Sequence, residues 1–99
     1  MYAILVITKM DSAHLAEQRR ELTERIVPMV RDQPGFVSGT WMHDVAGGRA
    51  SSLIVMDTEE GAQRLATYVR MDTARPEAAK AGVSLETVFV GEVHALAKK

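Results

Sequence analysis

The chain has 99 residues, of which 46% are hydrophobic and 25% are charged, and its net charge is −1. This length is enough for one domain and not for two, so we expect a single domain over 1–99. The near-neutral charge gives no basic excess for binding nucleic acid. The lack of cysteine excludes disulfides, thiolate metal sites and cysteine nucleophiles.

The first segment of the chain, 2–8, is short and rich in β-branched and large apolar residues, which predicts a strand. Ile4 and Val6 form one alternating set, and Leu5 and Ile7 form the other. Both faces of this strand are therefore apolar, and we expect both to be covered. The segment lacks the leading positive charge of a signal peptide and is too short to span a bilayer, so we expect a cytoplasmic protein without membrane contact.

A helix is predicted next, and Asp11 offers a side-chain oxygen to its first amides. Its apolar stripe at helical spacing consists of Leu15, Leu22, Ile26, Met29 and Val30. The polar residues between them, including Gln18 and Arg25, are expected on the solvated face. Pro28 removes one backbone hydrogen bond and predicts a kink or a loosened turn over 24–28.

A β-hairpin and a second helix follow in the sequence. A turn at 45–48 with two glycines joins predicted strands at 36–44 and 49–57. Thr58 is expected to cap the second helix, whose apolar stripe consists of Ala62, Leu65, Ala66 and Val69. A loop over 72–82, with one helical turn near its end, leads to the last strand.

The last strand, predicted over 83–95, has Leu85 and Phe89 on one face and Val88 and Val90 on the other. The element order is therefore β-α-β-β-α-β. Right-handed crossovers turn this order into a four-stranded antiparallel sheet with both helices on one face, the ferredoxin-like α+β fold. Because the first and last strands are apolar on both faces, we expect a second copy to cover the open face and form a homodimer.

Three histidines are candidates for chemistry: His14, His43 and His94. We expect His14 and His94 at the periphery, and no pair has metal-ligand spacing, so no metal site is expected. Trp41 lies two residues before His43 on a predicted strand, so both side chains point to one face of the sheet. An indole beside an imidazole can hold a flat aromatic ligand by stacking and one hydrogen bond. The alternative is that Trp41 is a core or interface aromatic and His43 lies at the mouth of the hairpin.

Two segments carry a resemblance to a known family. The helix end and strand start Gln33-Pro34-Gly35-Phe36, together with the segment 55–62 before the second helix, resemble the antibiotic biosynthesis monooxygenase domain family. The resemblance covers nearly the whole chain. It implies a dimeric α/β barrel, in which two ferredoxin-like subunits face each other around cavities.

The resemblance also bears on activity. Some members of this family are cofactor-independent monooxygenases that act on quinol-like or polyketide aromatic substrates, and others degrade haem. Active members often have a tryptophan at the end of the third strand, where this chain has Met56, so Met56 is an expected ligand-binding residue. Haem-degrading members place a histidine in the second helix, and 63–71 contain none. We therefore expect neither haem nor another cofactor.

Two functional hypotheses follow. In the first, the protein is a cofactor-free monooxygenase that favours the ionised form of a phenol-like substrate, which then reduces oxygen itself. His43 is its catalytic residue and lines the ligand site with Trp41 and Met56, while Tyr2 and Tyr68 are further candidates. In the second, the protein is a non-catalytic dimeric module that binds a small molecule or assists another protein. The expected partners are a second copy of the chain and a small aromatic ligand, with no nucleic acid and no membrane.

Overall fold

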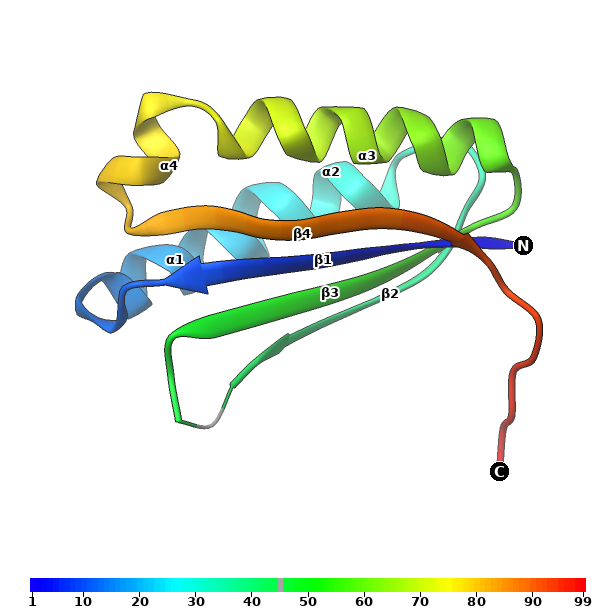
Figure 1. The fold of residues 1–99 in the computed structure, drawn as a ribbon, viewed down its shortest axis with the longest axis horizontal. Helices are drawn as coiled ribbons and strands as arrows, with labels where there is room; N and C mark the ends of the chain where they lie inside the picture. The colour runs from blue at the N-terminus through cyan, green and yellow to red at the C-terminus, as the bar shows by residue number, and fades with distance from the viewer. Residues whose placement is uncertain (45) are drawn as a thin grey trace.

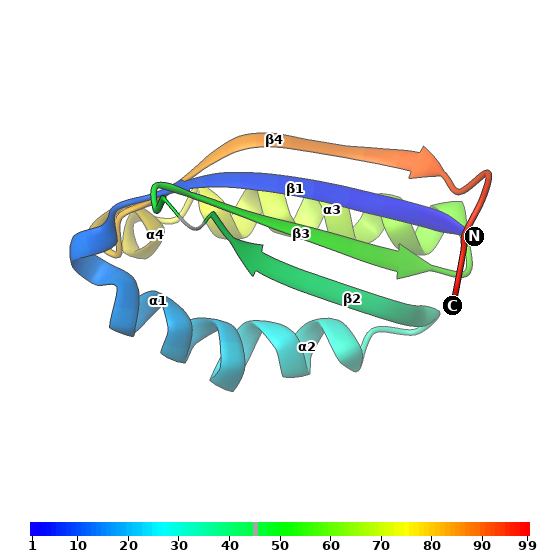
Figure 2. The same ribbon diagram turned by 90° about the horizontal axis from the view of Figure 1, so that it is seen from below.

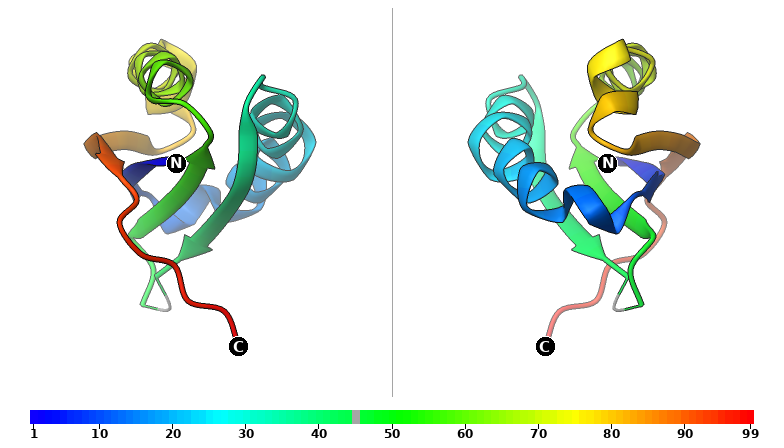
Figure 3. Two further views of the ribbon diagram at one scale, coloured as in Figure 1. Left: turned by 90° about the vertical axis from the view of Figure 1, so that its right-hand side faces the viewer. Right: turned by 90° about the vertical axis from the view of Figure 1, so that its left-hand side faces the viewer.

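The structure is a computed structural model that describes residues 1–44 and 46–99 (Figure 1). Its main elements are β1 (Tyr2–Met10), α1 (Leu15–Glu21), α2 (Val27–Arg31), β2 (Phe36–His43), β3 (Arg49–Met56), α3 (Glu59–Thr73), α4 (Pro76–Lys80) and β4 (Val83–Glu92). The four strands form one antiparallel sheet in the order β2-β3-β1-β4. The helices stand on one side of it as two separate groups (Figure 3). This is the ferredoxin-like α+β fold that the sequence predicted.

Three of the four predicted strands end slightly earlier than expected, whereas β1 continues two residues further, to Met10. β2 ends at His43, β3 at Met56 and β4 at Glu92. The turn predicted at 45–48 includes Val45, which lies outside the described residues. Within the described part of the chain, no helix has both the length and the apolar character needed to cross a membrane.

The first helical segment consists of α1, a π-helical turn over Leu22–Ile26 and α2, all in line (Figure 2). The wide turn ends two residues before Pro28, which has no amide hydrogen and whose ring presses on the carbonyl of the preceding turn. The predicted loosening of the helix at this proline is confirmed. A positive φ of 83° at Gly35 then lets the chain turn into β2.

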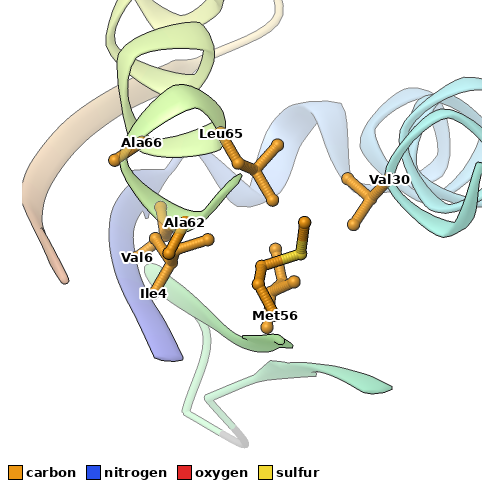
Figure 4. Packing of buried hydrophobic residues seen from close by; sticks show 8 residues of the cluster. Ile4, Val6, Val30, Met56, Ala62, Leu65 and Ala66 are labelled. Atoms are coloured by element: carbon orange, nitrogen blue, oxygen red, sulfur yellow. The ribbon is translucent and has the colours of Figure 1, made fainter. Parts of the chain in front are cut away.

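α3 packs its apolar stripe against the inner face of the sheet. Thr58 Oγ1 accepts a hydrogen bond from the Gly61 amide at 3.1 Å and caps the helix, as predicted. The buried core lies where this stripe meets β1, β3 and α2 (Figure 4), and its members are Ile4, Val6, Val30, Ile54, Met56, Ala62, Leu65 and Ala66. Full burial of a large apolar side chain contributes about 1.5–3 kcal/mol, so these contacts hold the helices onto the sheet.

The pairing of β1 with β4 changes register between Ile7 and Thr8. Thr8 therefore faces Leu85, which packs on the core together with Val88, whereas Phe89 points to the other face and is 52% exposed. The prediction that Leu85 and Phe89 share a face is wrong. A β-bulge adds one residue to β4, and strict alternation stops at that point.

The sheet face away from the helices is apolar, and no described helix lies over it (Figure 2). We call its central residues the outer patch: Leu5, Ile7, Met42, Leu53 and Phe89. Leu5 pairs with Leu53 on one side and with Phe89 on the other. Leu53 is 47% exposed and Met42 is 67% exposed. Such a cluster of large exposed side chains on one face is unusual for a monomer.

Candidate functional site

A cavity of about 530 Å³ lies between the inner face of the sheet and the two groups of helices. Three parts of the structure border it and leave it partly open to solvent: the sheet forms the floor, the segment from α1 to α2 forms one wall, and α3 forms the other. The residues that matter most for the site are Thr8, Gln18, Arg25, Trp41, His43 and Tyr68, all of which line the cavity. The volume is within the usual range of small-molecule sites.

Both Trp41 and His43 belong to the helix-covered face of the sheet. Trp41 pairs with Ser52, and His43 pairs with Ala50. Ser52 and Ala50 alternate with the buried Ile54, so all of them point toward the helices. The sequence left open which face carries Trp41 and His43, and the structure places both side chains in the lining of the cavity.

The indole of Trp41 lies back along its own strand, over Gly39. A Cβ atom at Gly39 would stand 2.6 Å from Trp41 Cη2 and 3.4 Å from a ring carbon of Phe36. Any larger residue at this position would therefore displace the indole. Gly39 thus leaves the space that this orientation of Trp41 needs, as glycines within strands often do where another group approaches the backbone closely.

Two buried polar atoms of the cavity residues have no hydrogen-bond partner among the described residues: His43 Nε2 and Gln18 Oε1. Gln18 is only 7% exposed, so the prediction that it lies on the solvated face is wrong. It lies three residues after Leu15 and four before Leu22, which places it inside the apolar stripe of the helix. Buried polar atoms without partners are uncommon in folded proteins and mark the positions where a ligand or a water can bind.

The polar groups gather at one end of the cavity. His43, Ala50 and Thr8 are neighbours in one row across the sheet, and Thr8 is a buried polar residue at 8% exposure. The rows toward the opposite end contain Ile54, Ile4 and other core residues. A ligand in this cavity therefore meets a polar end near the hairpin and an apolar end near the core.

Arg25 links the two helical walls of the cavity. Its Nη2 donates to Asp72 Oδ2 at 3.3 Å and its Nη1 donates to Tyr68 Oη at 3.4 Å, both on α3. Its Nε donates to Glu21 on its own helix at 2.6 Å. Burial lowers the pKa of Arg25, but the hydrogen bonds to Glu21 and Asp72 raise that pKa by more, so it lies above the ordinary arginine value. Arg25 keeps 36% of its side chain exposed, so it lies at the border between the predicted solvated face and the cavity.

The remaining predicted site residues lie apart from the polar end. Met56 is 1% exposed and packs in the core, and it does not belong to the residues that line the cavity. Tyr2 packs against the same core, whereas Tyr68 lines the cavity beside Arg25. Over 1–44 and 46–99, no three histidine or acidic side chains are grouped closely enough to hold a metal ion.

The fold of this chain is shared by several solved structures. A monooxygenase from the gene ActVA-Orf6 of Streptomyces coelicolor, solved in complex with the ligand Nanaomycin D, is 17% identical with a TM-score of 0.65, over 99% of this chain and 91% of that chain. SnoaB, a cofactor-independent oxygenase from Streptomyces nogalater solved as a mutant, is 14% identical with a TM-score of 0.66, over 99% and 97% of the two chains.

A dimeric ferredoxin-like protein from an uncultured marine organism is 13% identical with a TM-score of 0.65, and the match covers the whole of both chains. Neither the models of known protein families nor the curated proteins match the sequence. A structure from Deinococcus radiodurans that is described as an antibiotic biosynthesis monooxygenase is 16% identical with a TM-score of 0.66, over 100% and 98% of the two chains, which agrees with the sequence resemblance. At these identities the structural neighbours establish the ferredoxin-like fold, and the activity has to be argued from the site.

Proposed function

We propose that this protein is a cofactor-independent monooxygenase that oxidises a small aromatic, quinol-like substrate in the cavity between the sheet and the helices. The observation that carries the proposal is that Trp41 and His43 line the same cavity, with His43 Nε2 buried and unpartnered among the described residues. Monooxygenase neighbours of the same fold, one of them described as cofactor-independent, support it.

In this proposal, Trp41 and His43 have different roles. The Trp41 indole, which lies over Gly39, stacks on the flat substrate. His43 Nε2 accepts the proton of a phenolic hydroxyl, because a histidine can exchange protons near neutral pH. The ionised ring then supplies all four electrons that reduce O2. One oxygen atom bonds to a ring carbon, whose C–H bond breaks, and becomes a carbonyl oxygen. The other oxygen atom leaves as water with that hydrogen and the proton held by His43, and the product is a quinone.

The protein is further proposed to work as a homodimer that covers the outer patch. The patch presents Leu53, Phe89 and Met42 to solvent at 47–67% exposure, and the ferredoxin-like neighbour is described as dimeric. Sedimentation equilibrium at micromolar concentration is expected to give twice the chain mass of 10.9 kDa. Leu53→Glu is expected to shift the mass toward that of the monomer, because it buries a charge in the interface. A wild-type monomer at this concentration would refute the dimer.

Oxygen uptake with a panel of quinols tests the catalytic proposal. Wild-type protein is expected to raise the rate of oxygen uptake with at least one quinol. His43→Ala is expected to lower the turnover by roughly 100-fold or more, as for the loss of a general base. The matched control is His94→Ala, which removes an exposed histidine that does not line the cavity. Equal turnover of the His43→Ala variant and wild type would refute the role of His43.

One observation favours the second candidate, a non-catalytic binding module. Arg25 is a cation in the cavity lining, and two carboxylates, Glu21 and Asp72, already neutralise it. It therefore offers little free positive charge to a phenolate. Tight binding of quinols by wild-type protein without any increase in oxygen uptake would support the module and refute the enzyme.

A further inference from the structure

Gln18 presents a hydrogen-bond acceptor whose orientation is fixed by the backbone. Its Nε2 donates to the carbonyl of Ala81 at 2.9 Å and to the carbonyl of Asp11 at 3.0 Å. The reverse orientation of the amide would set Oε1 against two carbonyl oxygens, which accept hydrogen bonds and do not donate them. The oxygen is therefore the atom left over, and it is buried without a partner among the described residues.

A fixed amide oxygen accepts hydrogen bonds and repels anions. Its complement is a hydroxyl or N–H group that keeps its proton, because an ionised phenolate has no hydrogen to donate. A buried acceptor without a hydrogen-bond partner is energetically costly. A ligand that donates a hydrogen bond to it should therefore bind more tightly than a ligand of similar shape that cannot donate one.

Gln18 reaches from the wall of the cavity to the side of β1 and β4, whereas His43 is on the side of β2. The backbone partners of Gln18 follow the end of β1 and precede β4, whereas His43 is on β2. β2 and β1 are separated by β3 in the sheet, so their backbones are roughly 10 Å apart at one strand spacing of about 4.8 Å each. A flat ligand that reaches both atoms therefore has polar groups on two opposite edges.

We infer that Gln18 is a specificity-determining residue, which selects aromatic substrates with a protonated hydroxyl or N–H on the edge opposite to the group that meets His43. This inference rests on the proposed aromatic site and refines it. The two ends of the substrate are then treated differently: the edge at His43 loses its proton, and the edge at Gln18 keeps it.

The test compares two probes, a naphthalenediol with hydroxyls on opposite edges and its dimethyl ether, which has no donor. Wild-type protein is expected to bind the diol roughly 10-fold more tightly in calorimetric titrations. Gln18→Met, which is similar in size and has no acceptor oxygen, is expected to lose most of this preference. A purely structural role of Gln18 would weaken both probes equally and leave the preference unchanged, and that result would overturn the inference.

The matched control is Gln33→Met. Gln33 also bonds a backbone carbonyl, that of Met29 at 3.3 Å, and does not line the cavity. The Gln33→Met variant is expected to keep the full preference for the diol over the dimethyl ether. An equal loss of preference in both variants would overturn the inference, because Gln33 does not contact the cavity.

A second measurement uses wild-type protein and so does not depend on whether the variant folds. The chain has three glutamines and no asparagine, so its side-chain amide NMR signals are few. The signal of Gln18 is expected to shift with the diol and not with the ether, while those of Gln33 and Gln63 stay in place. Binding of both probes with equal affinity and an unmoved Gln18 signal would overturn the inference alone and leave the aromatic site standing. Binding of neither probe would overturn the proposed function as well.

Discussion

The two ends of the space between the sheet and the helices differ in how they are filled. At the end near α2, Ile54, Met56 and Leu65 are at most 3% exposed and belong to the core, where Met56 and Leu65 lie close to the other core side chains (Figure 4). Ile54 and Leu65 also form part of the apolar end of the cavity lining. At the end near the hairpin, small and polar residues such as Ala50 and Thr8 leave a cavity. The same sheet and the same helix α3 run along both ends, so the size of the side chains on them helps to decide which end is core and which is hollow.

In the space between the sheet and the helices, the filled end therefore contributes mainly to stability, and the hollow end is the candidate binding site. Large apolar side chains at the filled end bury surface and hold the helices on the sheet. The hollow end gives up such contacts and leaves His43 Nε2 and Gln18 Oε1 unpartnered among the described residues, which is costly in a structure without a ligand. Substitutions at the two ends should therefore have opposite consequences.

The largest expected effect on stability is that of Ile54→Ala at the filled end. Ile54 is 2% exposed, and a buried isoleucine replaced by alanine leaves a void, so the free energy of unfolding should fall by about 2–5 kcal/mol. For a domain of this size, the melting temperature should drop by roughly 10 °C or more. Denaturant unfolding at a fixed protein concentration measures the loss.

The control for Ile54→Ala is Ser52→Ala, two residues earlier on the same strand and face, in the cavity lining. This change removes one hydroxyl next to an open space, and we expect a loss within about 1 kcal/mol. Equal losses at Ile54 and Ser52 would contradict the distinction between the filled end and the hollow end.

The next effect concerns an alanine at each end. Ala50→Leu adds three carbons where the cavity offers room, so the free energy of unfolding should stay unchanged or rise by about 1 kcal/mol. Ala66→Leu adds the same group at a position with 0% exposure, where overpacking should cost about 1–3 kcal/mol. Calorimetric melts compare the two variants, and a destabilised Ala50→Leu would show that the cavity is too small for the added group.

Ala50→Leu should also remove the binding of aromatic probes, because Ala50 lies between His43 and Thr8 on the cavity floor. We expect the affinity for the naphthalenediol to fall by more than 10-fold, whereas Ala66→Leu should keep binding wherever it stays folded. An Ala50→Leu variant that is as stable as wild type or more stable, but no longer binds the naphthalenediol, would support the distinction between the filled end and the hollow end.

The filled end was largely predictable from the sequence. The apolar stripe from Ala62 to Val69, the cap at Thr58 and the effect of Pro28 depend on local spacing and on backbone chemistry, and all three are confirmed. Local periodicity was sufficient here because a stripe of large apolar side chains is buried against the core.

The hollow end was harder to predict, because its polar residues have partners that are far away in the sequence. Gln18 bonds the carbonyl of Ala81, 63 positions later, and Arg25 bonds Asp72, 47 positions later. Neither partner can be deduced from helical periodicity, which assigns a polar residue to solvent unless a tertiary contact is known. The bulge in β4 was not predicted for the same reason, since it depends on the pairing of β4 with β1.

The smallest expected effect on stability concerns the bridge between Arg25 and Asp72. The side chains of this pair are 36% and 17% exposed, so solvent and salt screen much of their attraction, and Arg25→Met should cost at most about 1 kcal/mol of unfolding free energy. The bridge nevertheless joins the two helical walls across the cavity. Without it, we expect the naphthalenediol to enter and leave faster, with both rate constants raised by a similar factor in stopped-flow experiments that follow the fluorescence of Trp41.

Arg64→Met is the matched control for this last prediction. Arg64 pairs with Glu60 at 3.3 Å, one turn earlier on α3, and does not line the cavity. Both variants lose an exposed arginine pair, but only Arg25→Met removes a contact between the walls. The rate difference between Arg25→Met and wild type should shrink at high salt, where the wild-type bridge is screened as well. Equal acceleration by Arg64→Met would show that the loss of charge, and not the loss of the bridge, opens the cavity.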